Sequence, residues 1–88
     1  YNWDDGSKAL IYPNPSNGLF NISFYAQADK KYSLSINNVL GQILSNEIIS
    51  GTGQNMIIQK DMSSYANGIY YLRIQADDLN LIRSFVIE

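Results

Sequence analysis

Two pairs of adjacent aspartates come closest, by type and spacing, to a site that could do chemistry. Asp4-Asp5-Gly6 lies near the start of the chain, and Asp77-Asp78 lies near its end. Paired carboxylates could bind Ca²⁺ or act as the acid/base pair of a glycosidase. Calcium needs about six to eight oxygen ligands, and neither stretch has the Asp-x-Asp-x-Asp-Gly spacing of a calcium loop. No pocket-forming residues flank the pairs, so we interpret them as solvated turn residues.

The chain has 88 residues and contains neither cysteine nor histidine. These are the most common metal ligands, and histidine is also the most common general base. We therefore expect a protein that is not an enzyme and that uses no metal and no cofactor. Small secreted domains usually depend on disulfides, so this one must be stabilised by packing alone.

The composition is 45% hydrophobic and 16% charged, with a net charge of −2. The polar surface must then come largely from neutral side chains, which is more typical of extracellular modules than of cytosolic enzymes. The six basic residues are scattered, so we expect no nucleic-acid binding. No apolar run approaches the roughly 20 residues that span a bilayer, so we expect no direct membrane insertion. No basic-then-apolar signal peptide opens the chain, so for an exported protein we expect either that this signal lies elsewhere or that the chain is a fragment of a larger precursor.

Seven tyrosines and Trp3 could form a platform on which sugar rings stack. Four of them fall in phase with expected core positions, where the ring can be buried and the hydroxyl stay wet: Tyr12, Tyr32, Tyr65 and Tyr70. Tyr25, Tyr71 and Trp3 are left to face outward. They keep open an alternative function, a fibronectin-like or carbohydrate-binding sandwich appended to a secreted hydrolase. That alternative predicts polysaccharide affinity that is lost on Tyr71→Ala or Trp3→Ala.

The elements that would position these side chains are short strands. Residues 1–8 lack apolar periodicity and are interpreted as a linker, and residues 9–88 as one domain. In the second run Phe20, Ile22 and Phe24 alternate with polar residues, which predicts one buried face. The expected strands are Ala9–Tyr12, Leu19–Tyr25, Tyr32–Ile36, Gln42–Ser50, Asn55–Lys60, Ile69–Gln75 and Leu81–Ile87. About seven strands with frequent turns predict an all-β sandwich.

Four local features refine this prediction. The adjacent apolar pairs within Gln42–Ser50 indicate either a bulge or a strand covered on both faces. The stretch 61–68 has the spacing of a single helical turn, and Asp77-Asp78 marks a hairpin turn. Gly68 is expected either to adopt a positive φ or to let Tyr70 pack closely. With a positive φ, Gly68→Val should destabilise the fold by roughly 1–3 kcal/mol.

The segment Tyr12-Pro13-Asn14-Pro15-Ser16-Asn17-Gly18 is the most distinctive in the chain. Its two prolines fix their own φ and push the residues before them into extended conformations. Asn17-Gly18 then tolerates the positive φ of a sharp turn. We interpret this segment, the proline arch, mainly as a connection between two strands rather than as a polyproline ligand.

Four motifs in order give this chain a family resemblance: Tyr-Pro-Asn-Pro-x-x-Gly-x-Phe-x-Ile, Leu-Gly-Gln, Asn-Gly-Ile-Tyr-Tyr-Leu-Arg-Ile, and a final apolar strand. Over residues 9–88 it resembles the type A C-terminal sorting domain of the type IX (Por) secretion system of Bacteroidetes. The resemblance implies an immunoglobulin-like antiparallel sandwich that directs an upstream cargo, joined in cis, to the cell surface or medium. The route runs through the periplasm and outer membrane. The implied partners are the type IX translocon, its shuttle and a sortase-like peptidase that removes the domain during anchoring.

The resemblance assigns roles to particular residues. The structural motif positions are Pro13, Asn14, Pro15, Gly18, Gly41 and Gln42. The family usually has Asp three residues before the central Gly, and here Asn38 can make a similar Asx-type cap. Asp61-Met62-Ser63-Ser64-Tyr65 matches the family's Asp-Leu-Ser-x-Leu, but the final strand has one basic residue instead of several lysines.

For the sorting signal we expect recognition of the hairpin Gly68–Glu88 by strand pairing and by apolar contacts. The residues expected to take part are Gly68, Tyr70, Leu72, Arg73, Arg83, Phe85, Val86 and Ile87. Ile69 and Tyr71 should flank the last strand on the outer face. Cleavage is expected in the linker, in the region of Gly6, Ser7 and Lys8, because an unstructured backbone can enter a peptidase active site.

Overall fold

The computed structural model describes residues 9–77 and 79–88. The expected linker and the cleavage region Gly6–Lys8 lie outside these residues, as does Asp78. The described part of the chain folds into seven strands: β1 (Ala9–Tyr12), β2 (Leu19–Ala26), β3 (Lys31–Asn38), β4 (Ile43–Ser50), β5 (Gln54–Asp61), β6 (Gly68–Ala76) and β7 (Leu79–Ile87). Within it there is no helix long and apolar enough to cross a bilayer.

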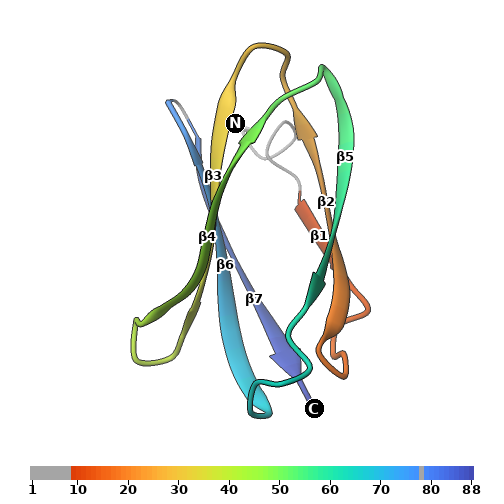
Figure 1. Ribbon diagram of the computed structural model, residues 1–88, viewed down its shortest axis with the longest axis vertical. Coiled ribbons are helices and arrows are strands. Elements are labelled where there is room, and N and C mark those ends of the chain that lie inside the picture. The colour runs from red at the N-terminus through yellow and green to blue at the C-terminus, as the bar shows by residue number, and fades with distance from the viewer. Residues whose placement is uncertain (1–8, 78) are drawn as a thin grey trace.

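The strands form two antiparallel sheets that face each other as a sandwich (Figure 1). One sheet has the order β1-β2-β5, and the other has the order β4-β3-β6-β7. Strands β2 and β3 are central in their sheets, and each alternates buried and outward residues along its length. The fold is the predicted all-β, immunoglobulin-like sandwich.

Alternating apolar residues from both sheets meet in one core. Phe20, Ile22 and Phe24 are buried as predicted, with exposed fractions of 0–3%. Aromatic rings connect the layers, since Phe20 of β2 lies 4.8 Å from Phe85 of β7, centroid to centroid. The largest fully buried side chains are Phe20, Ile22, Leu34, Ile36, Leu72, Ile74, Phe85 and Ile87.

Of the two alternatives for Gln42–Ser50, the bulge is the one present, and it lies near the start of β4. Ile36 of β3 pairs with Ser45 and Asn37 pairs with Ile43, so Leu44 is the extra residue. The alternative, a strand covered on both faces, is wrong, because Ile43 and Ile48 are more than 60% exposed. A bulge lets adjacent apolar residues occur without burying both faces.

The two remaining predicted connections are also confirmed. Ala76 pairs with Leu79, so the predicted hairpin turn between β6 and β7 is present and tight. In the β5–β6 loop, the amide of Tyr65 donates to the carbonyl of Met62 at 3.0 Å, which makes one helical turn. Met62 is buried, but Tyr65 is 38% exposed, so its predicted place in the core is wrong.

Tyr12 is a second correction among the tyrosines. It is 40% exposed because its register partner is Asn21, on the outward face of β2. Tyr32 and Tyr70 are buried as predicted, with exposed fractions of 3% and 7%. The hydroxyl of Tyr32 accepts a hydrogen bond from the amide of Gln27 at 2.9 Å, so its polar end is satisfied at the edge of the core.

Candidate functional site: the C-terminal hairpin and the proline arch

The proline arch lies beside the end of the C-terminal strand. Ser16 forms a parallel bridge with Ile87. The Ser16 amide donates to the carbonyl of Val86 at 3.0 Å, and the Glu88 amide donates to the carbonyl of Ser16 at 2.8 Å. The side-chain Oδ1 of Asn14 accepts from the Val86 amide at 3.0 Å. The proline arch and the end of β7, some 70 positions apart in the sequence, therefore form one structural unit. The sequence analysis considered them as two separate features.

The arch is shaped by its own side chains as well as by its prolines, whose preceding peptide bonds are both cis. Ser16 is buried, and its Oγ accepts from the Gly18 amide at 3.1 Å. Gly18 has φ 107°, and a Cβ there would lie 2.5 Å from the Cα of Ser63. Sequence reasoning did not single out Ser16, although serine before Asn-Gly is a signal for this kind of side-chain-supported turn.

The central turn has the Asx cap that Asn38 was expected to provide. Its Oδ1 accepts from the Leu40 amide at 3.0 Å and from the Gln42 amide at 3.1 Å. Its amide nitrogen donates to Oε1 of Gln42 at 2.8 Å. Gly41 has φ 85°, and nothing lies within 4 Å of where its Cβ would be. Gly41 and Gln42 therefore shape the β3–β4 turn, as the motif predicts.

At the start of the hairpin, Gly68 has φ 156° and an open space at the Cβ position. The positive-φ expectation is confirmed, whereas close packing of Tyr70 against Gly68 is not observed. Tyr70 instead stacks on Phe85, with centroids 5.9 Å apart. Its hydroxyl donates to the carbonyl of Ala66 at 2.5 Å, which fixes the β5–β6 loop against the hairpin.

Asp61 organises the beginning of that loop. Its Oδ1 accepts from the hydroxyl of Ser63 at 2.7 Å and from the Ser63 amide at 3.0 Å. These hydrogen bonds, the side-chain one most strongly, lower the pKa of Asp61 below its ordinary value. The Asp-Met-Ser stretch therefore has a local capping role beside Gly18.

The hairpin separates its predicted recognition residues between two faces. Leu72, Phe85 and Ile87 are at most 2% exposed, and Tyr70 is also buried. The expectation that Leu72, Phe85 and Ile87 contact a partner directly needs correction, because in the folded domain these side chains belong to the core. Val86 does face outward, where its register partner is Ile69.

The outward-facing side chains of β6 and β7 form a continuous surface, the hairpin outer face. Tyr71 pairs with Ser84 and Arg73 pairs with Ile82, so these residues share the face with Ile69 and Val86. Ile69 is 49% exposed and Ile82 is 46% exposed. Ile69 and Tyr71 thus lie where the sequence placed them, beside the last strand. Arg83 has the opposite parity and lies on the core side of β7.

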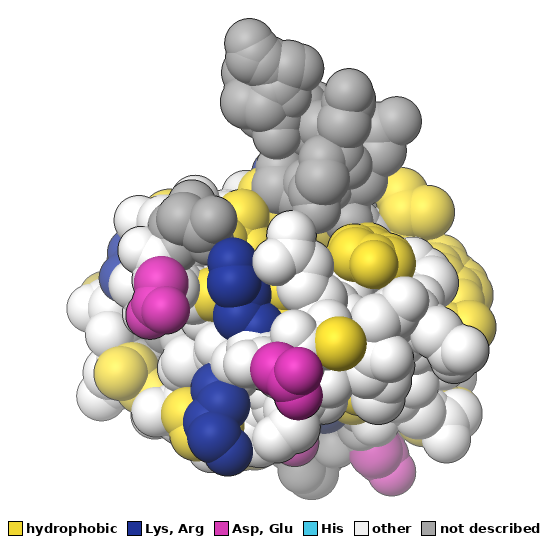
Figure 2. All heavy atoms as spheres, turned by 90° about the horizontal axis from the view of Figure 1, so that it is seen from above, with side chains coloured by type: hydrophobic (Ala, Val, Ile, Leu, Met, Phe, Trp, Pro, Cys, Tyr) yellow, Lys and Arg dark blue, Asp and Glu magenta, His cyan; other side chains and the backbone are white. Residues whose placement is uncertain are grey.

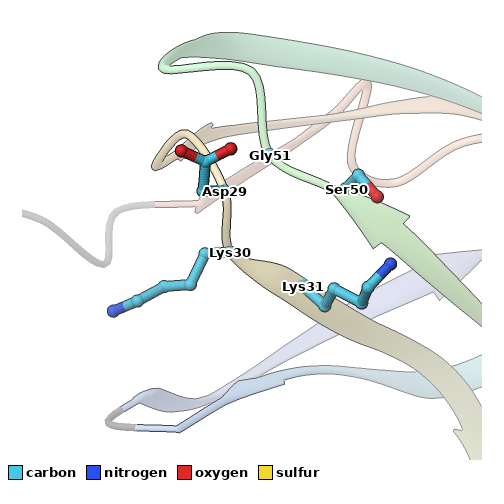
Figure 3. Close-up of a pocket in the computed structure, with 5 residues that line it drawn as sticks. All are labelled: Asp29, Lys30, Lys31, Ser50 and Gly51. Atoms are coloured by element: carbon cyan, nitrogen blue, oxygen red, sulfur yellow. The ribbon is translucent and has the colours of Figure 1, made fainter.

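A hollow at the opposite end of the sandwich does not have the character of a site. It has a volume of about 300 Å³ and is lined by Asp29, Lys30, Lys31, Ser50 and Gly51 (Figure 3). Lys30 and Lys31 extend in opposite directions from the start of β3, so their ammonium groups do not converge on a ligand. Figure 2, which looks onto this end, shows basic and acidic side chains interspersed rather than gathered by sign.

The tyrosines likewise do not build one platform. Tyr12 and Tyr25 face outward from the three-stranded sheet, whereas Tyr71 faces outward from the four-stranded sheet. Trp3 lies outside the described residues. Nowhere in residues 9–77 and 79–88 do three or more acidic side chains gather closely enough to hold a metal ion.

The fold and the arch–hairpin unit define a small immunoglobulin-like sandwich whose C-terminal strand is held by a proline turn. A family model described as a secretion system C-terminal sorting domain matches residues 10–88, nearly the whole chain. The chain therefore belongs to this family, the C-terminal sorting domains of type IX secretion. Membership implies interaction with the type IX secretion machinery and export to the cell surface or medium. No curated protein matches the chain.

Proposed function

We propose that this domain carries its sorting signal on the C-terminal hairpin and that the export machinery reads the outer face of the folded sandwich. The family match over residues 10–88 carries the functional assignment. The exposed apolar side chains on the hairpin outer face support the placement, since such patches mark interaction sites on small soluble domains. Leu72, Phe85 and Ile87 then act by holding the hairpin in shape.

The remaining steps of the proposal concern the cargo and its release. The domain directs an upstream cargo, joined in cis, through the translocon and its shuttle. A sortase-like peptidase then cuts in the segment preceding β1, in the region of Gly6, Ser7 and Lys8. A cut there would leave all seven strands on one product, because β1 begins at Ala9. Mass spectrometry of the released cargo tests this step, and a cut within residues 20–80 would contradict it.

A reporter fusion in a type IX-competent cell tests the recognition surface. The double variant Ile69→Ser with Val86→Ser removes two neighbouring apolar side chains from the hairpin outer face. We expect surface display of the reporter to fall by about tenfold or more, as when two anchor side chains of an interface are truncated. Thermal unfolding of the purified variants checks that the fold is intact.

The matched control is Leu19→Ser with Ile57→Ser. Leu19 is 45% exposed and Ile57 is 64% exposed, and both face outward from the other sheet, where Leu19 shares a face of β2 with Ser23, the register partner of Ile57. The control removes similar apolar surface from the opposite face and should leave display unchanged. Equal loss of display in the two double variants would show that the hairpin outer face is not the recognised surface.

A further inference from the structure

The two flanks of the sandwich are closed differently. Each flank is formed by one edge strand from each sheet, β4 with β5 on one side and β1 with β7 on the other (Figure 1). On the first flank, Glu47 of β4 and Lys60 of β5 form an ion pair across the gap between the sheets. Both residues lie on the core side of their strands, because they pair with buried Leu34 and Phe20. Inward-pointing charges of this kind protect strand edges.

On the second flank, the described residues include a cation, Arg83, but no carboxylate that pairs with it. Arg83 lies on the core side of β7, opposite buried Leu72. It lines a groove of about 180 Å³ between β7 and β1, together with Ala9, Leu10, Ile11, Asn14 and Ser84. Its guanidinium donates to the carbonyl of Ile82 at 3.2 Å, on its own strand. Within the described part of the chain, no carboxylate forms an ion pair with Arg83.

The backbone of β7 beside this groove is an open edge. Val86 directs both its amide and its carbonyl away from β6, toward Asn14 and Ser16 of the arch. Because these groups alternate along a strand, Ile82 and Ser84 direct theirs to the same edge. β7 is the last strand of its sheet, and the arch bridges it at Ile87. At Ile82 and Ser84 the edge therefore presents backbone groups with which a further strand could pair, continuing the line of the arch.

The size of the groove indicates what it can hold. Small-molecule pockets usually measure about 300–1,000 Å³, so a groove of about 180 Å³ suits a single side chain. An extended chain that pairs with β7 would direct every second side chain into this groove, toward Arg83. A carboxylate there would complete on this flank the ion pair that Glu47 and Lys60 make on the other.

We infer that this groove binds an extended segment of a partner protein, which pairs with β7 at Ile82–Ser84 and places an acidic side chain on Arg83. The inference rests on the sorting function proposed above, because it names the chemistry that the export machinery would present. In the bound state the guanidinium exchanges the Ile82 carbonyl for the partner's carboxylate, and the carbonyl accepts a backbone amide of the incoming strand.

Two blocked peptides of alternating Val and Thr test the inference, one with Glu and one with Lys at its central position. Titrated into the isotope-labelled protein, the Glu peptide should shift the amide signals of Ile82 and Ser84. We expect it to bind about tenfold more tightly than the Lys peptide, a difference of about 1.4 kcal/mol. Arg83→Gln should abolish this preference, and Arg83→Lys should keep part of it.

Ser84→Pro is the backbone counterpart, since proline is tolerated where the missing amide faces outward from an edge strand. It should abolish peptide binding in a protein that unfolds near the wild-type temperature. The inference is overturned by absence of shifts at Ile82 and Ser84, by equal affinity for both peptides, or by shifts at Asn46 and Ile57 on the far flank. A negative peptide titration overturns only this inference, because the sorting function is tested separately by export of the reporter. If the Ile69→Ser/Val86→Ser variant still blocks export, the proposed sorting function holds; if it does not, the proposed function is wrong whatever the peptides do.

Discussion

At the scale of single residues, a glycine can be required for its positive φ, for the space at its Cβ position, or for both. Gly41 has φ 85°, and a Cβ added there would have no atom within 4 Å. Gly18 has φ 107°, and a Cβ added there would lie 2.5 Å from the backbone of Ser63. We expect Gly41→Ala to cost about 1–2 kcal/mol for the left-handed backbone. Gly18→Ala should cost a further ~1–3 kcal/mol for the overlap. Urea unfolding measures both, and equal costs would mean that the 62–63 backbone moves away freely.

Asp61 gives a prediction for pH at the same scale. Its folded pKa is below the ordinary value of 3.8 because Ser63 donates two hydrogen bonds to the carboxylate. The contribution of Asp61 to stability is therefore fully present above pH 3.8, and it is lost as the pH falls through the lowered pKa of the folded state. Ser63→Ala removes the larger cause, so the pKa of Asp61 should rise toward 3.8 in an NMR titration. An unchanged pKa in that variant would assign the shift to the backbone amide alone.

At the scale of elements, the proline arch and β7 should open together. Asn14→Ala removes the acceptor of the Val86 amide and should cost about 0.5–1.5 kcal/mol. Hydrogen exchange at Val86 and Glu88 should quicken, while exchange in the centre of β3 stays as in the wild type. Asn55→Ala is the control, because it removes a hydrogen bond to Ser23 on the outer face of the other sheet. Faster hydrogen exchange at Val86 in the Asn55→Ala control would mean that the whole domain is destabilised, and not only the contact between the arch and β7.

The elements also show what the sequence could and could not predict. Alternation located β2 and β6 to within one residue at each end, because each strand has one face in the core. Proline and Asn-Gly chemistry located the arch for the same local reason. The pairing of Ser16 with Ile87 depends on how two sheets close on each other, which no local pattern encodes. Tyr12 was misplaced because β1 has four residues, too few for its alternation to be read reliably.

The same limit applied to the candidate site. The motifs directed attention to Gly68–Glu88, and the outward positions of Ile69 and Tyr71 followed from period-two alternation. Alternation could equally have assigned Leu72, Phe85 and Ile87 to the core, where the structure has them. Arg83 has the same parity as Phe85, so alternation places it on the core side of β7. That a charged residue can lie there follows only from the position of β7 at the edge of its sheet, which the sequence does not show.

At the scale of the whole molecule, the strand that we propose to carry the signal, β7, is also part of the core, which affects how truncations can be interpreted. A domain of this kind is stable by about 5–15 kcal/mol in total. Phe85 is 1% exposed and contacts the rings of Phe20 and Tyr70, so Phe85→Ala should cost about 3–5 kcal/mol. Deleting Phe85–Glu88 removes Ile87 and the partners of the arch as well. We expect that deletion to unfold the sandwich.

Export of a reporter should therefore fail both in the Phe85–Glu88 deletion and in any variant that unfolds the domain, for the same reason. The discriminating comparison is Val86→Ser with Phe85→Ala, two neighbours on opposite faces of one strand. Val86→Ser should keep the unfolding temperature within a few degrees of the wild type and still reduce export. Phe85→Ala should lower the unfolding temperature strongly, and export should recover at growth temperatures where it stays folded. Normal export from an unfolded Phe85→Ala domain would mean that the machinery reads the linear C-terminal sequence instead of a face of the sandwich.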